Sequence, residues 1–375
     1  MLTILNVFSQ DISLSTLLID KSLTENANAV IRNHEIVVDL DDFDDMIIKE
    51  KRIITIFNKN GLPHLDAYVS YDLDLRVKSI AAKVYNKLGE EIDSYKKKAF
   101  DDYSNSRIRM FSDHLILNLD YTPTEYPFTF EFEHELHTNS TAFFPRWYAL
   151  EGYFLSTQKS SYKILNSNNI PLQVIEYNFD NINNGVITNK SENNLIHFEA
   201  TNIRAYKWEY MVPSLSKISP IVMVAPKKFN LINVEGSAEN WTDFGRWNFY
   251  NLLSGRSDLS ESTKNEIASL VKGIDDPIEK AKKIYNYVQD KTRYISIQLG
   301  VGGWQPMLAS QVDEVSYGDC KALTNYTKAL MESQGIEANY TVVLGDNKIR
   351  NIEKEFVGME GKHGISNIHN NGNQI

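Results

Sequence analysis

The spacing of apolar residues along the chain changes near residue 241. In the first part, apolar and polar residues alternate, most strictly over residues 128–136, and this period of two is typical of a strand with one buried face. Clusters of Gly, Asn and Asp separate the alternating segments, and such clusters form turns. We therefore predict that residues 12–240 form a large antiparallel β-sandwich region, made of one sandwich or two.

After residue 241 the apolar residues follow the period of a helix. One helix is predicted to open at Ser260 and another at Asp276-Pro277, because Ser and Asp accept hydrogen bonds from a free helix end and Pro fits its first turn. A third helix is predicted over residues 320–333, with strands on its C-terminal side. The predicted fold class is therefore α+β.

The last residues of the sequence predict a β-hairpin. Residues 363–368 are typical of a strand, and Asn371-Gly372 follows as a two-residue turn. Asn and Gly tolerate the positive φ angles that a type I′ turn requires. The expected register pairs Asn370 with Asn373 and His369 with Gln374.

Length and charge exclude several classes of protein. At 375 residues the chain is too long for a single hydrophobic core, so two or three domains are expected. The formal net charge is -10, which argues against a nucleic-acid partner because phosphate binding needs clustered Lys and Arg. No segment approaches the roughly 20 apolar residues that span a bilayer, so we predict no integral membrane segment.

The N-terminal residues 1–11 resemble the end of a signal peptide. Apolar residues lead to the small residues Val7 and Ser9, which flank a cleavage position before Gln10. On this interpretation the protein is exported to the periplasm or the extracellular space and associates with the cell envelope. The alternative is that residues 1–9 form a first strand.

Cys320 is the one cysteine of the chain, so an internal disulfide is excluded. Free cysteines are usually buried and inert. Here, however, the thiol follows Gly318-Asp319 at the first turn of a predicted helix, where free backbone N–H groups and the helix dipole stabilise a thiolate. We interpret Cys320 as a nucleophile, and the alternative is a capped helix start with an incidental small residue.

His363 is the candidate base for this thiol. It lies 43 residues after Cys320, at the start of a predicted strand. A nucleophilic thiol requires a neighbouring group that accepts its proton. A single histidine on a strand is more often structural, but the order of thiol helix, strand and histidine strand favours the catalytic interpretation.

The sequence around the thiol resembles a known family. Tyr-Gly-Asp-Cys-Lys at residues 317–321, with the apolar helix that ends at residues 335–338, is similar to the core of the transglutaminase-like superfamily. Residues 294–306 resemble a bacterial subgroup that carries an N-terminal β-sandwich domain of unassigned function, and residues 240–247 resemble the link between its two parts.

The resemblance implies a papain-like Cys–His–Asp triad with Cys320 and His363 as its first two members. The family's Asp lies on the strand after the histidine strand, so residues 241–375 are expected to be a catalytic core truncated at its C-terminal end. The oxyanion would be held by the Cys320 N–H group and by Gln298 or Trp304, and the alternative for those two is core packing. No cofactor is implied.

The implied reaction is acyl transfer from a peptide or isopeptide amide of a protein or peptide substrate. Either water or an amine resolves the acyl-enzyme, and the sequence does not choose between them. The competing hypothesis is a non-catalytic exported binding or scaffold protein with a vestigial transglutaminase-like domain.

Two other patterns are set aside as sites. His134 and His137 are not spaced as in the His-Glu-x-x-His zinc motif, and on a strand they fall on opposite faces. Residues 300–303 lack the spacing of a dinucleotide-binding loop. We therefore predict no metal site.

Overall fold

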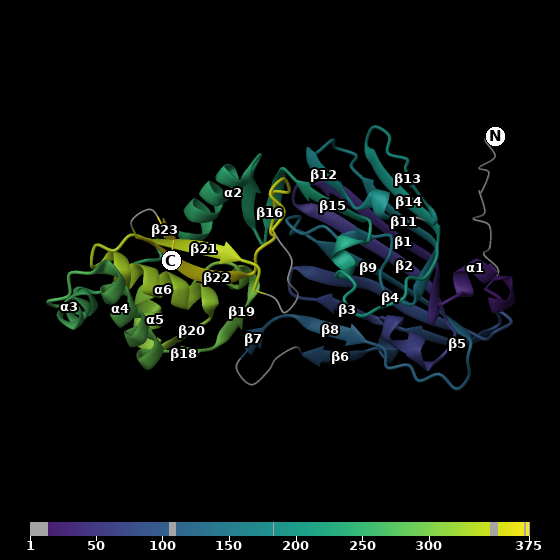
Figure 1. Ribbon diagram of the computed structural model, residues 1–375, viewed down its shortest axis with the longest axis horizontal. Coiled ribbons are helices and arrows are strands. Elements are labelled where there is room, and N and C mark those ends of the chain that lie inside the picture. Colours follow the sequence, from purple (N-terminus) through teal and green to yellow (C-terminus); the bar gives the residue numbers. More distant parts are fainter. Residues whose placement is uncertain (1–13, 105–109, 183, 346–351, 371–372, 375) are drawn as a thin grey trace.

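A computed structural model describes residues 14–104, 110–182, 184–345, 352–370, 373 and 374 (Figure 1). The predicted signal-peptide remnant, residues 1–11, and the predicted turn tip Asn371-Gly372 lie outside the described residues. In Figure 1 the strand-rich part lies on one side and most of the helices lie on the other. Within the described residues, no helix combines the length and the apolar composition needed to cross a bilayer.

An eight-stranded sheet dominates the strand-rich part. In spatial order its strands are β13 (Val186–Asn189), β14 (Leu195–Ile203), β11 (Leu155–Leu165), β1 (Ala29–Asp42), β2 (Asp45–Ile56), β9 (Phe128–Thr138), β4 (Leu75–Tyr85) and β5 (Glu91–Lys96). All neighbours pair antiparallel except β1 and β11, which run parallel. Parallel neighbours need a long crossover, and more than a hundred residues separate β1 from β11 in the sequence.

Smaller sheets and short helices complete this part. The sheets are β3-β8-β6 (Tyr68–Tyr71, Leu115–Asn118, Asp101–Ser104), β10-β15-β12 (Trp147–Tyr148, Ile221–Pro226, Leu172–Tyr177) and β16-β17 (Lys228–Leu231, Val234–Ser237). The α-helix α1 spans Lys21–Thr24, and the 3-10 turns are η1 (Thr16–Leu18), η2 (Lys59–His64), η3 (Lys97–Ala99), η4 (Phe179–Asn181) and η5 (Leu215–Lys217).

The two faces of the large sheet differ as strict alternation predicts. The inner face carries two hydrophobic clusters. One packs against β3 and β8 through Val69 and Leu117, and the other packs against β10 and β15 through Trp147 and Val222. The outer face carries ion pairs such as Lys51 Nζ to Glu131 Oε1 at 2.6 Å. The large sheet is therefore one layer of a sandwich, with a charged outer surface.

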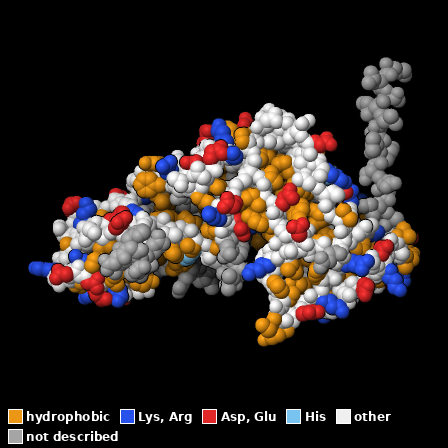
Figure 2. Space-filling model, turned by 45° about the horizontal axis from the view of Figure 1, so that its top comes forward, with side chains coloured by type: hydrophobic (Ala, Val, Ile, Leu, Met, Phe, Trp, Pro, Cys, Tyr) orange, Lys and Arg blue, Asp and Glu red, His pale blue; other side chains and the backbone are white. Residues whose placement is uncertain are grey.

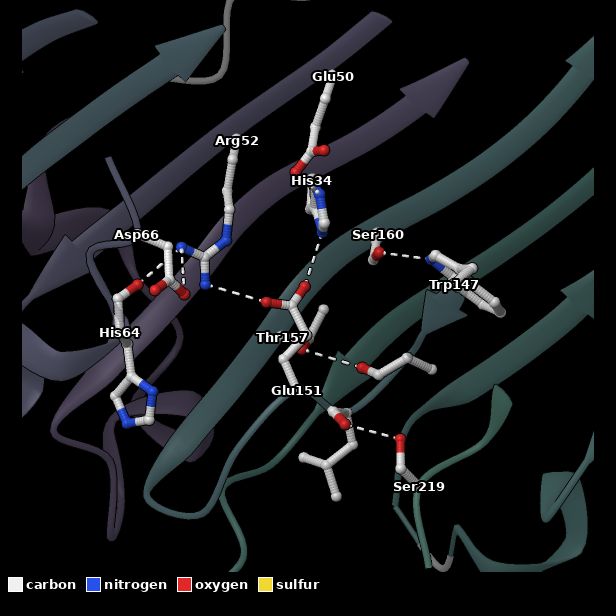
Figure 3. A network of polar contacts seen from close by, with 12 residues as sticks. His34, Glu50, Arg52, His64, Asp66, Trp147, Glu151, Thr157, Ser160 and Ser219 are labelled. Atoms are coloured by element: carbon white, nitrogen blue, oxygen red, sulfur yellow. Dashed lines mark hydrogen bonds and ion pairs between the residues drawn. The ribbon is translucent and has the colours of Figure 1, made fainter. Parts of the chain in front are cut away.

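A strip of charged side chains lies on the inner face between the two clusters (Figure 3). The His34 ring contacts Glu151 Oε1 through Nδ1 at 2.7 Å and Glu50 Oε1 through Nε2 at 2.9 Å. Arg52 donates to Glu151 Oε2 at 3.0 Å and to the His64 carbonyl at 2.7 Å. The buried charges thus satisfy one another, as burial in an apolar layer requires.

The C-terminal part packs its helices around a core of its own. Its elements are α2 (Trp241–Asn248), a π-helical segment η6 (Phe249–Leu253), α3 (Glu261–Leu270), α4 (Pro277–Lys291), β18 (Arg293–Tyr294), β19 (Ser296–Gln298), η7 (Gly300–Gly303), α5 (Ala309–Val315), β20 (Tyr317–Gly318), α6 (Cys320–Glu332), β21 (Ala338–Val343), β22 (His363–Asn370) and β23 (Asn373–Gln374). The observed pairing of β22 with β23, His369 with Gln374 and Asn370 with Asn373, is the predicted register.

Several contacts join the parts, and two of them position the candidate site. The short strand β7 (Met110–Ser112) pairs with β19, so the strand-rich part is hydrogen-bonded to the strand that ends at Gln298. The segment before β22 crosses in the other direction: Phe356 is buried against strands β12 and β15, and Gln173 of β12 contacts the Val357 amide at 2.9 Å and the Glu355 carbonyl. The strand that begins at His363 is therefore anchored on the β-sandwich.

Candidate active site

Cys320 is the first residue of α6, as predicted, and its side chain is partly exposed. Asp319 caps the helix, since its Oδ1 accepts a hydrogen bond from the Ala322 amide at 3.0 Å. Gly318 makes the sharp entry feasible, because a Cβ on it would lie 2.8 Å from Ala322 Cβ. The local sequence thus places the thiol at a tightly fixed helix end.

The Asp319 carboxylate is fully engaged at this helix end. Its Oδ2 pairs with the Lys321 ammonium, and both side chains are buried. A carboxylate held by a helix cap and a buried lysine is not free to accept a substrate proton. Asp319 therefore has a structural role next to the thiol.

Two tyrosines near the thiol were not predicted as site residues. Tyr294 of β18 lies opposite Gly318 in β20, which brings its hydroxyl close to the Cys320 side chain. Partial burial and the neighbouring thiol raise the pKa of Tyr294 to about 12. Burial, followed by Cys320 and Asp319, also raises the pKa of Tyr340. Both hydroxyls are therefore protonated donors at neutral pH.

His363 is the first residue of β22, opposite Val343 of β21. A Cβ on the next residue, Gly364, would lie 3.5 Å from Thr324 Oγ1. Thr324 is one helical turn after Cys320 and so shares its side of α6. Strand β22, which starts with His363, therefore begins close to the first turns of α6. Direct ion pairing of His363 with Cys320 stays a prediction.

A cleft of about 790 Å³ opens at this position. His363, Lys321 and the two oxyanion candidates, Gln298 and Trp304, all line it, as do aromatic side chains of α2 and η6: Trp241, Phe244 and Phe249. Trp304 also packs against Phe143 of the strand-rich part, with ring centroids 5.1 Å apart. Trp304 therefore packs against Phe143 and also lines the cleft, as both alternatives for this residue require.

The two patterns set aside as sites take up ordinary structural positions. In β9, His134 faces the buried side while His137 is on the opposite side and pairs with Asp45 at 2.6 Å. Residues 300–303 form the 3-10 turn η7 rather than the start of a long helix. Among the residues that the structure describes, no three His, Cys, Asp or Glu side chains are grouped to hold a metal ion.

Comparison with known proteins gives two family matches. Residues 45–207 match a domain of unknown function with a solved structure (DUF3857), and residues 265–367 match the transglutaminase-like superfamily. No curated protein matches the chain.

Among solved structures, a putative protease from Parabacteroides distasonis ATCC 8503 has a TM-score of 0.65 and 13% identity, over 92% of this chain and 66% of that one. At this identity the likeness shows the fold alone, and the present chain spans 66% of that protein's length. An M1 zinc metallopeptidase from Deinococcus radiodurans has a TM-score of 0.23 and 9% identity, over 66% of this chain and 55% of that one. The chain joins a DUF3857 domain to a domain of the transglutaminase-like superfamily.

Proposed function

We propose that the protein is a thiol acyl-transfer enzyme that acts on peptide or isopeptide amides. The observation that carries this proposal is the placement of Cys320 at a capped helix end, next to Lys321, which lines the same cleft as His363. The transglutaminase-like match over residues 265–367 supports it, because this is the segment that contains both residues.

In the proposed reaction, Cys320 Sγ attacks the amide carbon and His363 accepts the thiol proton. The carbonyl oxygen becomes an oxyanion, which the Cys320 N–H group and a cleft side chain, Gln298 or Trp304, stabilise. When the C–N bond breaks, His363 returns the proton to the leaving amine and a thioester remains. Water then releases the acid, or an amine forms a new amide, and either step restores the thiol.

Tyr294 is a further group near the reacting sulfur of Cys320. Its hydroxyl lies close to the Cys320 side chain, and its raised pKa keeps it a donor at neutral pH. A donor at this position stabilises negative charge on the sulfur before attack. The hydroxyl is therefore proposed to support the thiolate and not to act as a base.

The test uses a peptide mixture in which each position is random. The wild-type protein is incubated with the mixture, with and without a fluorescent primary amine, and products are identified by mass spectrometry. Shorter peptides indicate hydrolysis, and labelled peptides indicate amine transfer. Product formation that persists in Cys320→Ala, or is unaffected by His363→Ala, contradicts the proposal.

The competing proposal is a binding protein without catalysis. The aromatic wall of the cleft, Trp241, Phe244 and Phe249, favours it, since exposed rings contribute to ligand binding. Under this proposal the same mixture yields peptides retained by the protein and no products. The two functions are therefore separated by one experiment.

A further inference from the structure

A second cavity, of about 700 Å³, lies on the inner face of the large sheet. Its floor is formed by inward side chains of β2 and β9, including Ile48 and Leu136, and its walls include Phe143 and Phe144. These residues lie near the edge of the two hydrophobic clusters. The cavity thus exposes apolar surface that the covering sheets leave open.

The charged groups around this cavity are all acidic. No Lys or Arg is among the residues that line it. Four carboxylates do line it, those of Glu50, Asp72, Asp74 and Asp113. Asp72 pairs with His114 Nδ1 at 3.4 Å, and Glu50 pairs with His34 Nε2 at 2.9 Å. In the part of the chain that the structure describes, Asp74 and Asp113 form no ion pair with Lys or Arg. Burial, the largest effect, and the neighbouring Asp72 raise the pKa of Asp74, and the opposing effects of the Thr138 hydroxyl and Arg76 do not cancel this rise. A cation in the cavity would relieve this repulsion.

His134 lines the cavity with a buried ring. Its side chain is only 8% exposed, and its Nε2 lies 3.7 Å from Glu50 Oε2. Burial lowers the pKa of His134, so the ring is neutral at pH 7, and the carboxylate favours the proton on Nε2. Nδ1 then carries a lone pair, and it has no hydrogen-bond partner among the described residues. This nitrogen has almost no accessible surface, so it lies behind the cavity lining and does not contact an occupant of the cavity.

The second cavity is continuous in its lining with the candidate active-site cleft. Gln298, Gly303 and Trp304 line both. Asp113 fixes this shared wall, because its carboxylate accepts from the Gly300 amide at 2.9 Å and its own amide donates to the Gln298 carbonyl at 3.3 Å. The cavity and the cleft therefore adjoin at this wall.

We propose that this cavity is a specificity subsite that takes a lysine or arginine side chain of the peptide whose amide lies in the Cys320 cleft. The apolar floor would hold the aliphatic stem, and the carboxylates would hold the cationic head. The inference rests on the proposed function for the identity of the occupant. Because the residues come from the DUF3857 segment, it also gives that domain a role in substrate selection.

The test measures binding to the full chain that carries Cys320→Ala, so that no turnover is needed. A random peptide mixture is passed over the immobilised protein, and the retained peptides are sequenced. We expect Lys and Arg to be enriched several-fold at one position. Asp74→Asn should abolish that enrichment, and Asp74→Lys should replace it with Asp and Glu. The matched control is Asp290→Asn, on the exposed side of α4, which should leave the selection intact.

A second measurement does not depend on the cavity variants. The best retained peptide is compared with its norleucine analogue, which keeps the stem and lacks the charge, and its affinity should exceed that of the analogue at least tenfold. Retention without basic selection, equal affinity of the two peptides, or no retention at all overturns the inference. Basic selection by a chain whose wild type forms no product would contradict the proposed function alone.

Discussion

The side chains around Cys320 divide into those that fix the helix end and those that face the thiol. Asp319, Gly318 and Lys321 belong to the first group, and the sequence predicted the helix end that they form. Tyr294 and Tyr340 belong to the second. They were missed because their positions depend on strand pairings between distant segments, although Tyr294 opens the segment that resembles the bacterial subgroup.

Replacement of the thiol should remove activity and leave the fold intact. In Cys320→Ala the helix cap and the Asp319–Lys321 pair remain, and the lost side chain is small and partly exposed. The free energy of unfolding should therefore fall by about 1 kcal/mol or less. Denaturant titration checks this value. A much larger loss would indicate a structural cysteine.

Gly345 is predicted to position His363. A Cβ on Gly345 would lie 2.7 Å from His363 Cβ, which is too close for either residue to stay in place. Gly345→Ala should therefore lower the alkylation rate of Cys320 several-fold while melting stays within a few degrees of wild type. Gly302→Ala is the matched control, because nothing lies within 4 Å of a Cβ there. Equal rates in the two variants would exclude this positioning role.

At the scale of elements, helices with sequence-encoded ends were predicted well. Ser260 and Asp276 cap α3 and α4 through their side chains, as their sequence implied. The extended segment after α4 is divided into β18 and β19, which pair with different partners. The helix α5 was not predicted, because it is short and lacks a polar side chain at its N-cap, Leu308.

The segment that leads into β22 should depend on Gln173. Its side-chain amide bonds both the Val357 amide and the Glu355 carbonyl, so Gln173→Ala should remove about 1 to 2 kcal/mol of local stability. Amide hydrogen exchange over residues 352–360 should become faster, and alkylation of Cys320 should slow. Val174→Ala, at the next and more exposed position of β12, is the control. Unchanged exchange in Gln173→Ala would refute the anchoring.

At the scale of the whole molecule, the sequence predicted a strand-rich part followed by an α+β part. It also predicted the alternation of buried and exposed residues on the sheet faces. It did not predict the charged strip or the second cavity, since both join side chains from separate strands and loops. Figure 2 shows Lys and Arg side chains interspersed with Asp and Glu on the visible face. The cavity therefore differs from this visible face, because acidic side chains line it without any Lys or Arg.

The charged strip predicts a pH dependence of stability. Burial alone would lower the pKa of His34, but Glu151 and Glu50 raise it to about 9. A raised pKa adds stability that is complete below the ordinary value near 6.5 and is lost as the pH rises through about 9. The loss should reach at most about 3 kcal/mol. Calorimetry from pH 6 to 10 measures it, and His34→Gln should melt earlier but lose this slope. An equal slope in both proteins would exclude His34 as its source.

The central claim is that Cys320 is an activated nucleophile assisted by His363. Because the chain has one cysteine, the stoichiometry and rate of alkylation by iodoacetamide report on this thiol alone. We predict that the native protein reacts at pH 6 at least about tenfold faster than an unstructured cysteine peptide, which holds little thiolate at that pH. His363→Ala should lose this advantage. A native rate at or below that of the peptide, or a His363→Ala rate equal to wild type, would contradict the account.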